Sequence, residues 1–104
     1  QDKQPTAMVA FSDVIAFGIL DAARDAGVQV PHDLSVSGFD DLAEASWTTP
    51  GLTTIRQPIL TKGRLAAEYL VDVISGSTDP QTHQQRLATT LILRDSTASP
   101  PSAS

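Results

Sequence analysis

Apolar and polar positions alternate in blocks that predict a strand, a helix and a second strand in the first part of the chain. Residues 7–11 form a short apolar run, typical of a strand buried on both faces of a parallel sheet. Residues 14–26 place apolar side chains on one helical face before a glycine stop at Gly27. That face consists of Ile15, Ala16, Ile19, Leu20, Ala23 and Ala26. With a second strand over 34–39, the pattern predicts a βαβ unit.

The second half of the pattern predicts fewer elements. We expect a short extended segment over 52–55, a helix over 59–75 and a last strand over 87–94. The apolar face predicted for this second helix consists of Ile59, Gly63, Ala66, Ala67, Leu70 and Ile74. Residues 96–104 are rich in Ser, Pro and Ala, which predicts a frayed tail. So few strands indicate an incomplete α/β sheet, since a mean sheet has about five or six.

Composition and charge exclude several classes of function. The 104 residues suit one domain or part of one, and the net charge of −5 would repel a phosphate backbone. We therefore expect no DNA binding by this segment. The sequence has no cysteine and two distant histidines, so no metal site and no cofactor are expected. No apolar run approaches the roughly 20 residues that span a bilayer, and the start is no signal peptide, which favours a cytoplasmic protein without membrane contact.

Two polar pairs follow the predicted strands, at the edge where α/β sheets bind ligands. Ser12 and Asp13 follow the first strand, and Asp40 and Asp41 follow the second. Carboxylates there can accept hydrogen bonds from ligand hydroxyls, which suggests a sugar or another polyol. Asp13 is more simply interpreted as a helix cap. For Asp40, ligand contact and a turn-stabilising role both stay open.

Enzymatic chemistry has little support in the residues. There is no nucleophile with a base nearby in sequence and no Gly-rich phosphate loop, so we expect no enzyme. An Asp pair at a strand end could hold Mg²⁺, which keeps a receiver-like or phosphatase-like domain as an alternative. That alternative needs further acidic ligands and a phosphate-pairing lysine, and neither is evident.

Two aromatic residues stand at positions that burial alone does not explain. Phe17 falls on the polar face of the first helix, beside Asp21 and Arg24, and Trp47 falls in an irregular segment. Each could pack under loops of this chain, or the two could belong to an interface with a partner.

Spaced motifs along the chain resemble the LacI/GalR family of bacterial transcriptional regulators. The segments that carry the resemblance are PTAMVAFSD at 5–13, VPHDLSVSGFDD at 30–41, TPGLTTIRQP at 49–58, GRLAA at 63–67 and LRDST at 93–97. They follow the family's order over nearly the whole chain.

The resemblance implies a partial periplasmic-binding-protein-like type I fold, an α/β fold with a parallel sheet flanked by helices. In that family a small effector, sugar-like or nucleoside-like, binds between two lobes. The implied ligand-binding residues are Asp40, Ser12, Asp13, Gln57 and Ile59. Ser12 stands where many members have Asn, and Ile59 replaces an aromatic residue of some members. The implied homodimer interface contains Phe17, Trp47 and Thr48.

The resemblance also implies a domain organisation. Residues 1–95 would be the C-terminal portion of the effector-binding and dimerisation domain, with 96–104 as a flexible tail. Within it, residues 7–57 and 87–95 would belong to the lobe far from DNA, and 58–76 to the near lobe. DNA contact would be made only by a headpiece absent from this segment. A periplasmic sugar-binding protein shares the fold and is the alternative, but the 52–58 and 94–97 stretches favour the regulator.

Overall fold

The computed structural model describes residues 4–79 and 84–102. They fall into two units, one that runs to Arg56 and resumes at Thr90, and one over Gln57–Thr89. The elements in chain order are β1 (Ala7–Val9), α1 (Asp13–Ala26), β2 (Ser35–Ser37), the 3₁₀ helix η1 (Ala43–Ser46), β3 (Thr54–Arg56), α2 (Ile59–Ile74) and β4 (Thr90–Ile92). The unit boundaries lie near the division predicted from the sequence, whose assignment to far and near lobes stays a prediction.

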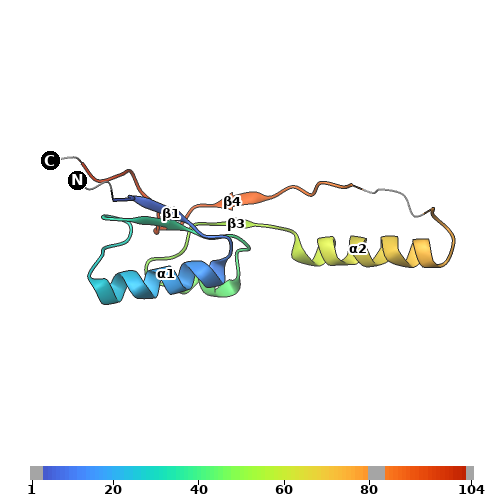
Figure 1. The fold of residues 1–104 in the computed structure, drawn as a ribbon, viewed down its shortest axis with the longest axis horizontal. Coiled ribbons are helices and arrows are strands. Elements are labelled where there is room, and N and C mark those ends of the chain that lie inside the picture. Colours follow the sequence, from blue (N-terminus) through green and yellow to red (C-terminus); the bar gives the residue numbers. More distant parts are fainter. Residues whose placement is uncertain (1–3, 80–83, 103–104) are drawn as a thin grey trace. The chain divides into compact units, whose positions relative to one another are not determined.

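The first unit is built on a strand, a helix and a strand. β1 pairs with β2 in parallel, with Ala7 opposite Ser35 and Val9 opposite Ser37. α1 connects the two strands and lies along one face of them (Figure 1). The predicted βαβ unit is therefore confirmed, with strands shorter than the apolar runs that indicated them.

The chain beyond β2 brings a third segment into the sheet. The Gly38 N–H donates to the Thr53 carbonyl at 2.9 Å, and the Asp40 N–H donates to the Ile55 carbonyl at 2.8 Å. β3 then pairs antiparallel with β4, with Thr54 opposite Ile92. The chain leaves the first unit after Arg56, at the end of β3, and re-enters it at Thr90, at the start of β4. Arg56 and Thr90 are paired in the β3–β4 ladder, so these two points lie side by side.

The core of the first unit lies between α1 and one face of the sheet. It contains Ala10, Ala16, Leu20, Val36, Ala45 and Leu52, all buried. Side chains alternate along a strand, so the neighbours of these positions face the other way. There Val9 and Phe11 are 80% and 90% exposed. Burial on both faces of the first strand was wrong for this chain, because no described residue covers the second face.

α1 begins and ends where its sequence signals predict. The Ser12 hydroxyl accepts from the Ile15 N–H at 3.2 Å, and Gly27 closes the helix with a φ of 74°. The face of α1 that is buried differs, however, from the face predicted from the apolar positions. Phe17, predicted to lie outside it, packs against the core, whereas Ile15, predicted to lie within it, is 51% exposed. The buried stripe starts at Asp13, a charged residue that a count of apolar positions ignores. The placement of Phe17 on the polar face was therefore wrong.

The segment after β4 is pinned to the sheet and is not frayed at its start. Ser96 is fully buried; its hydroxyl accepts from the Thr53 N–H at 2.8 Å and donates to the Val36 carbonyl. Two residues on, the Ala98 N–H donates to the Ser35 hydroxyl at 3.0 Å. A flexible tail beginning at 96 was wrong for these residues, since hydrogen bonds to β2 hold them.

In the second unit, α2 follows Pro58 and has its C-cap at Ser75, whose N–H donates to the Val71 carbonyl at 2.9 Å. No α2 side chain is fully buried. The half-buried side chains of α2 include Leu65 and Tyr69. A hollow of about 380 Å³ beside them is lined by Lys62, Leu65, Ala66, Tyr69, Leu70, Gln85 and Leu87. The helix is confirmed, whereas the large side chains of its predicted apolar face are half or more exposed, from 50% at Ile59 to 84% at Ile74.

The polar loop expected after α2 falls partly on residues 80–83, which lie outside the described residues. In the part of the chain that the structure describes, neither helix has the length and hydropathy needed to cross a membrane.

Candidate functional site

The turns that follow β1 and β2 meet at one edge of the sheet. The Asp13 N–H donates to the Phe39 carbonyl at 2.9 Å, which ties the start of α1 to the end of the β2 segment. The sequence predicted this proximity on the condition that the two strands are neighbours, and they are. Ser12, Asp13, Asp40 and Asp41 therefore belong to the same edge.

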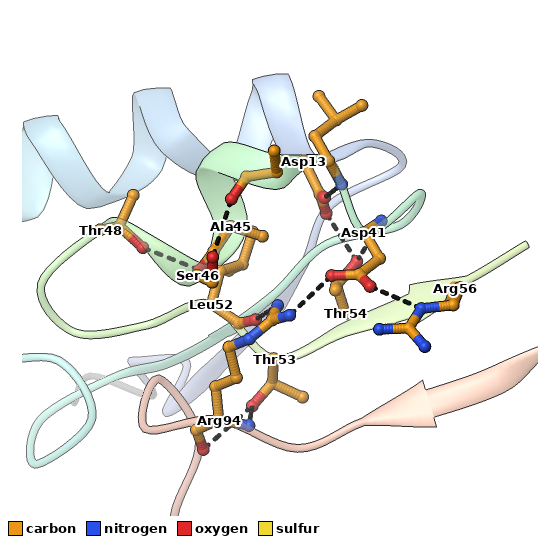
Figure 2. Close-up of polar contacts among 12 residues, drawn as sticks. Asp13, Asp41, Ala45, Ser46, Thr48, Leu52, Thr53, Thr54, Arg56 and Arg94 are labelled. Carbon is orange, nitrogen blue, oxygen red and sulfur yellow. Dashed lines mark hydrogen bonds and ion pairs between the residues drawn. The ribbon is translucent and has the colours of Figure 1, made fainter.

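Asp13 connects the helix start to two other segments (Figure 2). Its carboxylate is fully buried: Oδ1 accepts from the Thr54 hydroxyl at 2.6 Å, and Oδ2 accepts from the Leu42 N–H at 2.7 Å. A Cβ on Gly38 would collide with Oδ1 of this carboxylate, so any larger residue there would force the carboxylate to shift. The cap interpretation was wrong, because Ser12 supplies the cap and Asp13 forms an internal link.

Asp41 is the acceptor of a two-arginine cluster (Figure 2). Its side chain is 7% exposed, and its two oxygens accept from Arg94 Nη2 and Arg56 Nε, each at 2.8 Å. Burial opposes ionisation of Asp41, but the hydrogen bonds from Arg94 and Arg56 outweigh it and hold its pKa below the usual value. A Mg²⁺ ion on the Asp pair would have to displace both arginines, which argues against the metal-binding alternative.

Arg94 is itself fixed in place. Its Nη1 donates to the Leu52 carbonyl at 2.9 Å, and its backbone N–H donates to the Thr53 hydroxyl at 3.0 Å. Sequence reasoning missed Arg94, Arg56 and Thr54 as members of the site. The available signal was that both arginines lie in the segments that carry the family resemblance.

Asp40 has an unusual backbone. Its φ is 128° and that of Asp41 is 59°, so two consecutive residues with side chains lie in the positive-φ region that favours glycine. Asp40 is half-buried. A hollow of about 420 Å³ nearby is lined by Val9, Ala10, Phe11, Ser37, Gly38, Phe39, Thr53, Thr54, Ile55 and Leu91. Asp40, Ser12 and Asp13 are not among its lining residues.

Two other predicted ligand contacts belong to the second unit. Gln57 is half-buried and its Oε1 accepts from Lys62 Nζ at 3.3 Å. Ile59 is the first residue of α2 and is 50% exposed. The role of both in ligand binding stays a prediction.

The predicted interface residues have different surroundings. Trp47 follows η1 and is 72% exposed, so it does not pack under the loops of this chain. Thr48 is half-buried, and its hydroxyl donates to the Pro50 carbonyl at 2.8 Å. Phe17 is shared between the core and the surface. Their place in an interface stays a prediction.

Comparison with known proteins gives a consistent result. Residues 1–97 match the family model for a periplasmic binding protein-like domain. The chain is 42% identical over 96 residues to the HTH-type transcriptional regulator MalR of Streptomyces coelicolor. The aligned residues make up 92% of this chain and 28% of that protein. It thus spans little more than a quarter of that regulator.

Solved structures of LacI-family proteins resemble the chain as well. A LacI family transcriptional regulator from Enterococcus faecium with bound ribose superposes with a TM-score of 0.80 at 34% identity, over 93% of this chain and 36% of that one. The lac repressor dimer bound to operator and the anti-inducer ONPF gives a TM-score of 0.78 at 33% identity, over 89% and 32%.

The fold is a partial α/β fold with a parallel strand pair and a polar cluster at the edge where its strands end. The chain belongs to the periplasmic binding protein-like family, as the C-terminal part of the effector-binding region found in LacI/GalR transcriptional regulators. The family resemblance and the fold class predicted from the sequence are confirmed.

Proposed function

We propose that the chain is the effector-sensing and dimerisation part of a LacI/GalR-type regulator whose full-length form binds operator DNA under the control of a small sugar-like ligand. The observation that supports this proposal is the position of Asp40, in the Gly38-Phe39-Asp40-Asp41 segment, just beyond the carboxyl end of β2, where α/β sheets commonly bind ligands. The ribose bound to the related Enterococcus faecium regulator supports the ligand class.

In this proposal Asp40 accepts hydrogen bonds from ligand hydroxyls, and Ser12 adds a donor or acceptor at the neighbouring turn. Asp13 supports both turns from beneath, since its carboxylate oxygens already accept internal hydrogen bonds. Gln57 and Ile59 remain proposed contacts on the strength of their position in the family motif.

We also propose that the protein is a cytoplasmic homodimer and not an enzyme. Trp47 is the proposed centre of the dimer contact, because its indole is 72% exposed, with Phe17 and Thr48 beside it in the interface. The dimeric state of the related lac repressor supports this arrangement. The net charge of −5 argues against DNA contact by this segment, so in this proposal another part of the full-length protein contacts the operator.

Regulation would then be a population shift. An effector that binds one arrangement of the full-length protein better than another moves the equilibrium toward it and changes operator affinity by the same coupling free energy.

The proposal is tested by isothermal titration calorimetry on the full-length protein with a panel of pentoses, hexoses, disaccharides and nucleosides, beginning with D-ribose. We expect at least one member to bind, Asp40→Ala to abolish its binding, and Asp21→Ala, on the exposed face of α1, to leave it unchanged. Unchanged affinity in Asp40→Ala would refute the assignment of Asp40, and no binding across the panel would refute the ligand class.

A further inference from the structure

The backbone that carries Asp40 is held at three consecutive amides. The Asp40 N–H donates to the Ile55 carbonyl at 2.8 Å, the Asp41 N–H to the Thr54 hydroxyl at 3.3 Å and the Leu42 N–H to Asp13 Oδ2 at 2.7 Å. Such a run of fixed amides is needed because the φ values of 128° and 59° are unfavourable for residues with side chains. Without restraint, this segment would relax toward an ordinary extended or turn conformation.

A further restraint comes from the side chain of Asp41. It is almost fully buried, and both of its oxygens accept hydrogen bonds from arginines at 2.8 Å. Hydrogen bonds between charged groups are shorter and stronger than neutral ones. Arg56 is the last residue of β3, and Arg94 lies two residues beyond β4, so one carboxylate binds one strand of an antiparallel ladder and the segment that follows the other strand.

Of the two arginines that bind Asp41, Arg94 is the more buried and is held by a further hydrogen bond. The Arg94 side chain is 20% exposed and also donates to the Leu52 carbonyl, whereas the Arg56 side chain is 59% exposed. Solvent screens the Arg56 pair more strongly, so most of the restraint on Asp41 comes from Arg94.

We propose that Asp41, through Arg94 and Arg56, is a positioning residue for Asp40: it holds the 40–41 backbone at positive φ and thereby sets the direction in which Asp40 presents its carboxylate to ligand hydroxyls. This inference rests on the proposed function for its purpose, but the conformational part stands on the hydrogen bonds alone. In this proposal Asp41 does not touch the ligand, because its side chain is only 7% exposed and both of its oxygens bind arginines.

The conformational part is tested by NMR on the 104-residue chain. A φ of 128° gives residue 40 a small three-bond coupling between its amide proton and Hα, whereas an extended conformation gives a large one. Asp41→Asn keeps the size of the side chain and removes its charge; we expect the coupling to rise. Arg94→Gln should have the same effect, and Arg56→Gln a weaker one.

Two controls separate positioning from general destabilisation. Ser96→Ala removes a buried hydroxyl that binds Thr53 and Val36, so it should lower the unfolding temperature while the coupling at residue 40 stays small. Asp21→Asn breaks an exposed ion pair with Arg24 at 3.0 Å and should change neither quantity. If Asp41→Asn prevents folding, Arg56→Gln decides the question, since it removes one bond from an exposed side chain. A small coupling at residue 40 in folded Asp41→Asn or Arg94→Gln, or in Arg56→Gln where neither of these folds, would overturn the proposal.

The functional part uses the full-length protein and D-ribose in calorimetry. We expect Asp41→Asn to weaken binding by about tenfold or more, the effect that loss of a ligand-orienting neighbour has at metal sites. Lost binding in Asp40→Ala with unchanged binding in Asp41→Asn would overturn the positioning role alone. Unchanged binding in Asp40→Ala would count against the proposed function. If D-ribose does not bind, the same variants are titrated with the panel member that does, and the coupling at residue 40 decides the conformational claim in either case.

Discussion

The two units of the chain use polar side chains in different ways. In the first, Asp13, Thr54 and Ser96 are fully buried, and no buried side-chain polar atom among the described residues lacks a hydrogen-bond partner. In the second, no α2 side chain is fully buried. The interior of the first unit is therefore specified by individual hydrogen bonds, whereas α2 depends on helix propensity and partial packing. Substitutions should have very different effects in the two units.

Among substitutions in the hydrogen-bonded interior, the largest effect is expected for Asp13→Ala. It leaves the Thr54 hydroxyl and the Leu42 N–H without their acceptor, and each lost partner costs about 1–3 kcal/mol. The free energy of unfolding should fall by about 3 kcal/mol or more in urea denaturation. Asp25→Ala, exposed on the same helix, should change it by no more than about 0.5 kcal/mol. Equal effects of the two would refute the internal role of Asp13.

Gly38→Ala should come next. Its Cβ meets Oδ1 of Asp13 and lies 3.0 Å from Cδ2 of Leu52, so the buried carboxylate must shift. Overpacking of this kind costs about 1–3 kcal/mol. Gly18→Ala is the matched control, since nothing lies within 4 Å of its Cβ and alanine favours a helix. Thermal unfolding should show a loss for the first and a gain for the second, and a gain for both would contradict the contact with Asp13.

A smaller effect is expected in the pH dependence of stability. The pKa of Asp41 is lowered from 3.8 in the folded state, so the unfolded state binds the proton more tightly. The stabilisation is present above the unfolded pKa and is lost as the pH falls through the folded pKa. Asp41→Asn should therefore flatten the stability profile below about pH 4, where the parent is still losing this contribution. An unchanged acid limb in urea denaturation would show that the arginine cluster does not stabilise ionised Asp41.

The smallest effect is expected in the second unit. Leu60 on α2 is 89% exposed, so Leu60→Ala should alter the free energy of unfolding by no more than about 0.5 kcal/mol. Leu52→Ala, at a fully buried position in the first unit, should cost about 2–5 kcal/mol. Comparable losses in the two variants would remove the contrast between the units.

Local signals in the sequence predicted the elements well. Ser12 and Gly27 identified the ends of α1, because capping depends on residues within one turn. The apolar runs identified β1 and β2, and the family motifs identified the parallel fold. These features depend on near neighbours, or on patterns repeated through a family.

What the sequence did not reveal depends on residues far apart in the chain. Arg94 meets Asp41 across 53 positions, and Ser96 meets Val36 across 60, so neither contact follows from local spacing. Ser96 lies in a Ser- and Pro-rich stretch that is typical of a flexible tail, yet its hydroxyl is hydrogen-bonded to the backbone of Thr53 and Val36. Phe17 was misplaced because the buried stripe of α1 begins with a charged residue.

The central claim is that Asp40 binds the hydroxyls of a small ligand from the ligand-binding edge of the sheet. The most direct test is a crystal structure of the full-length protein with the panel member that binds most tightly. We predict a ligand hydroxyl within hydrogen-bonding distance of the Asp40 carboxylate, with Asp41 still bonded to Arg56 and Arg94. A well-ordered ligand bound elsewhere, with no contact to Asp40, would contradict the account.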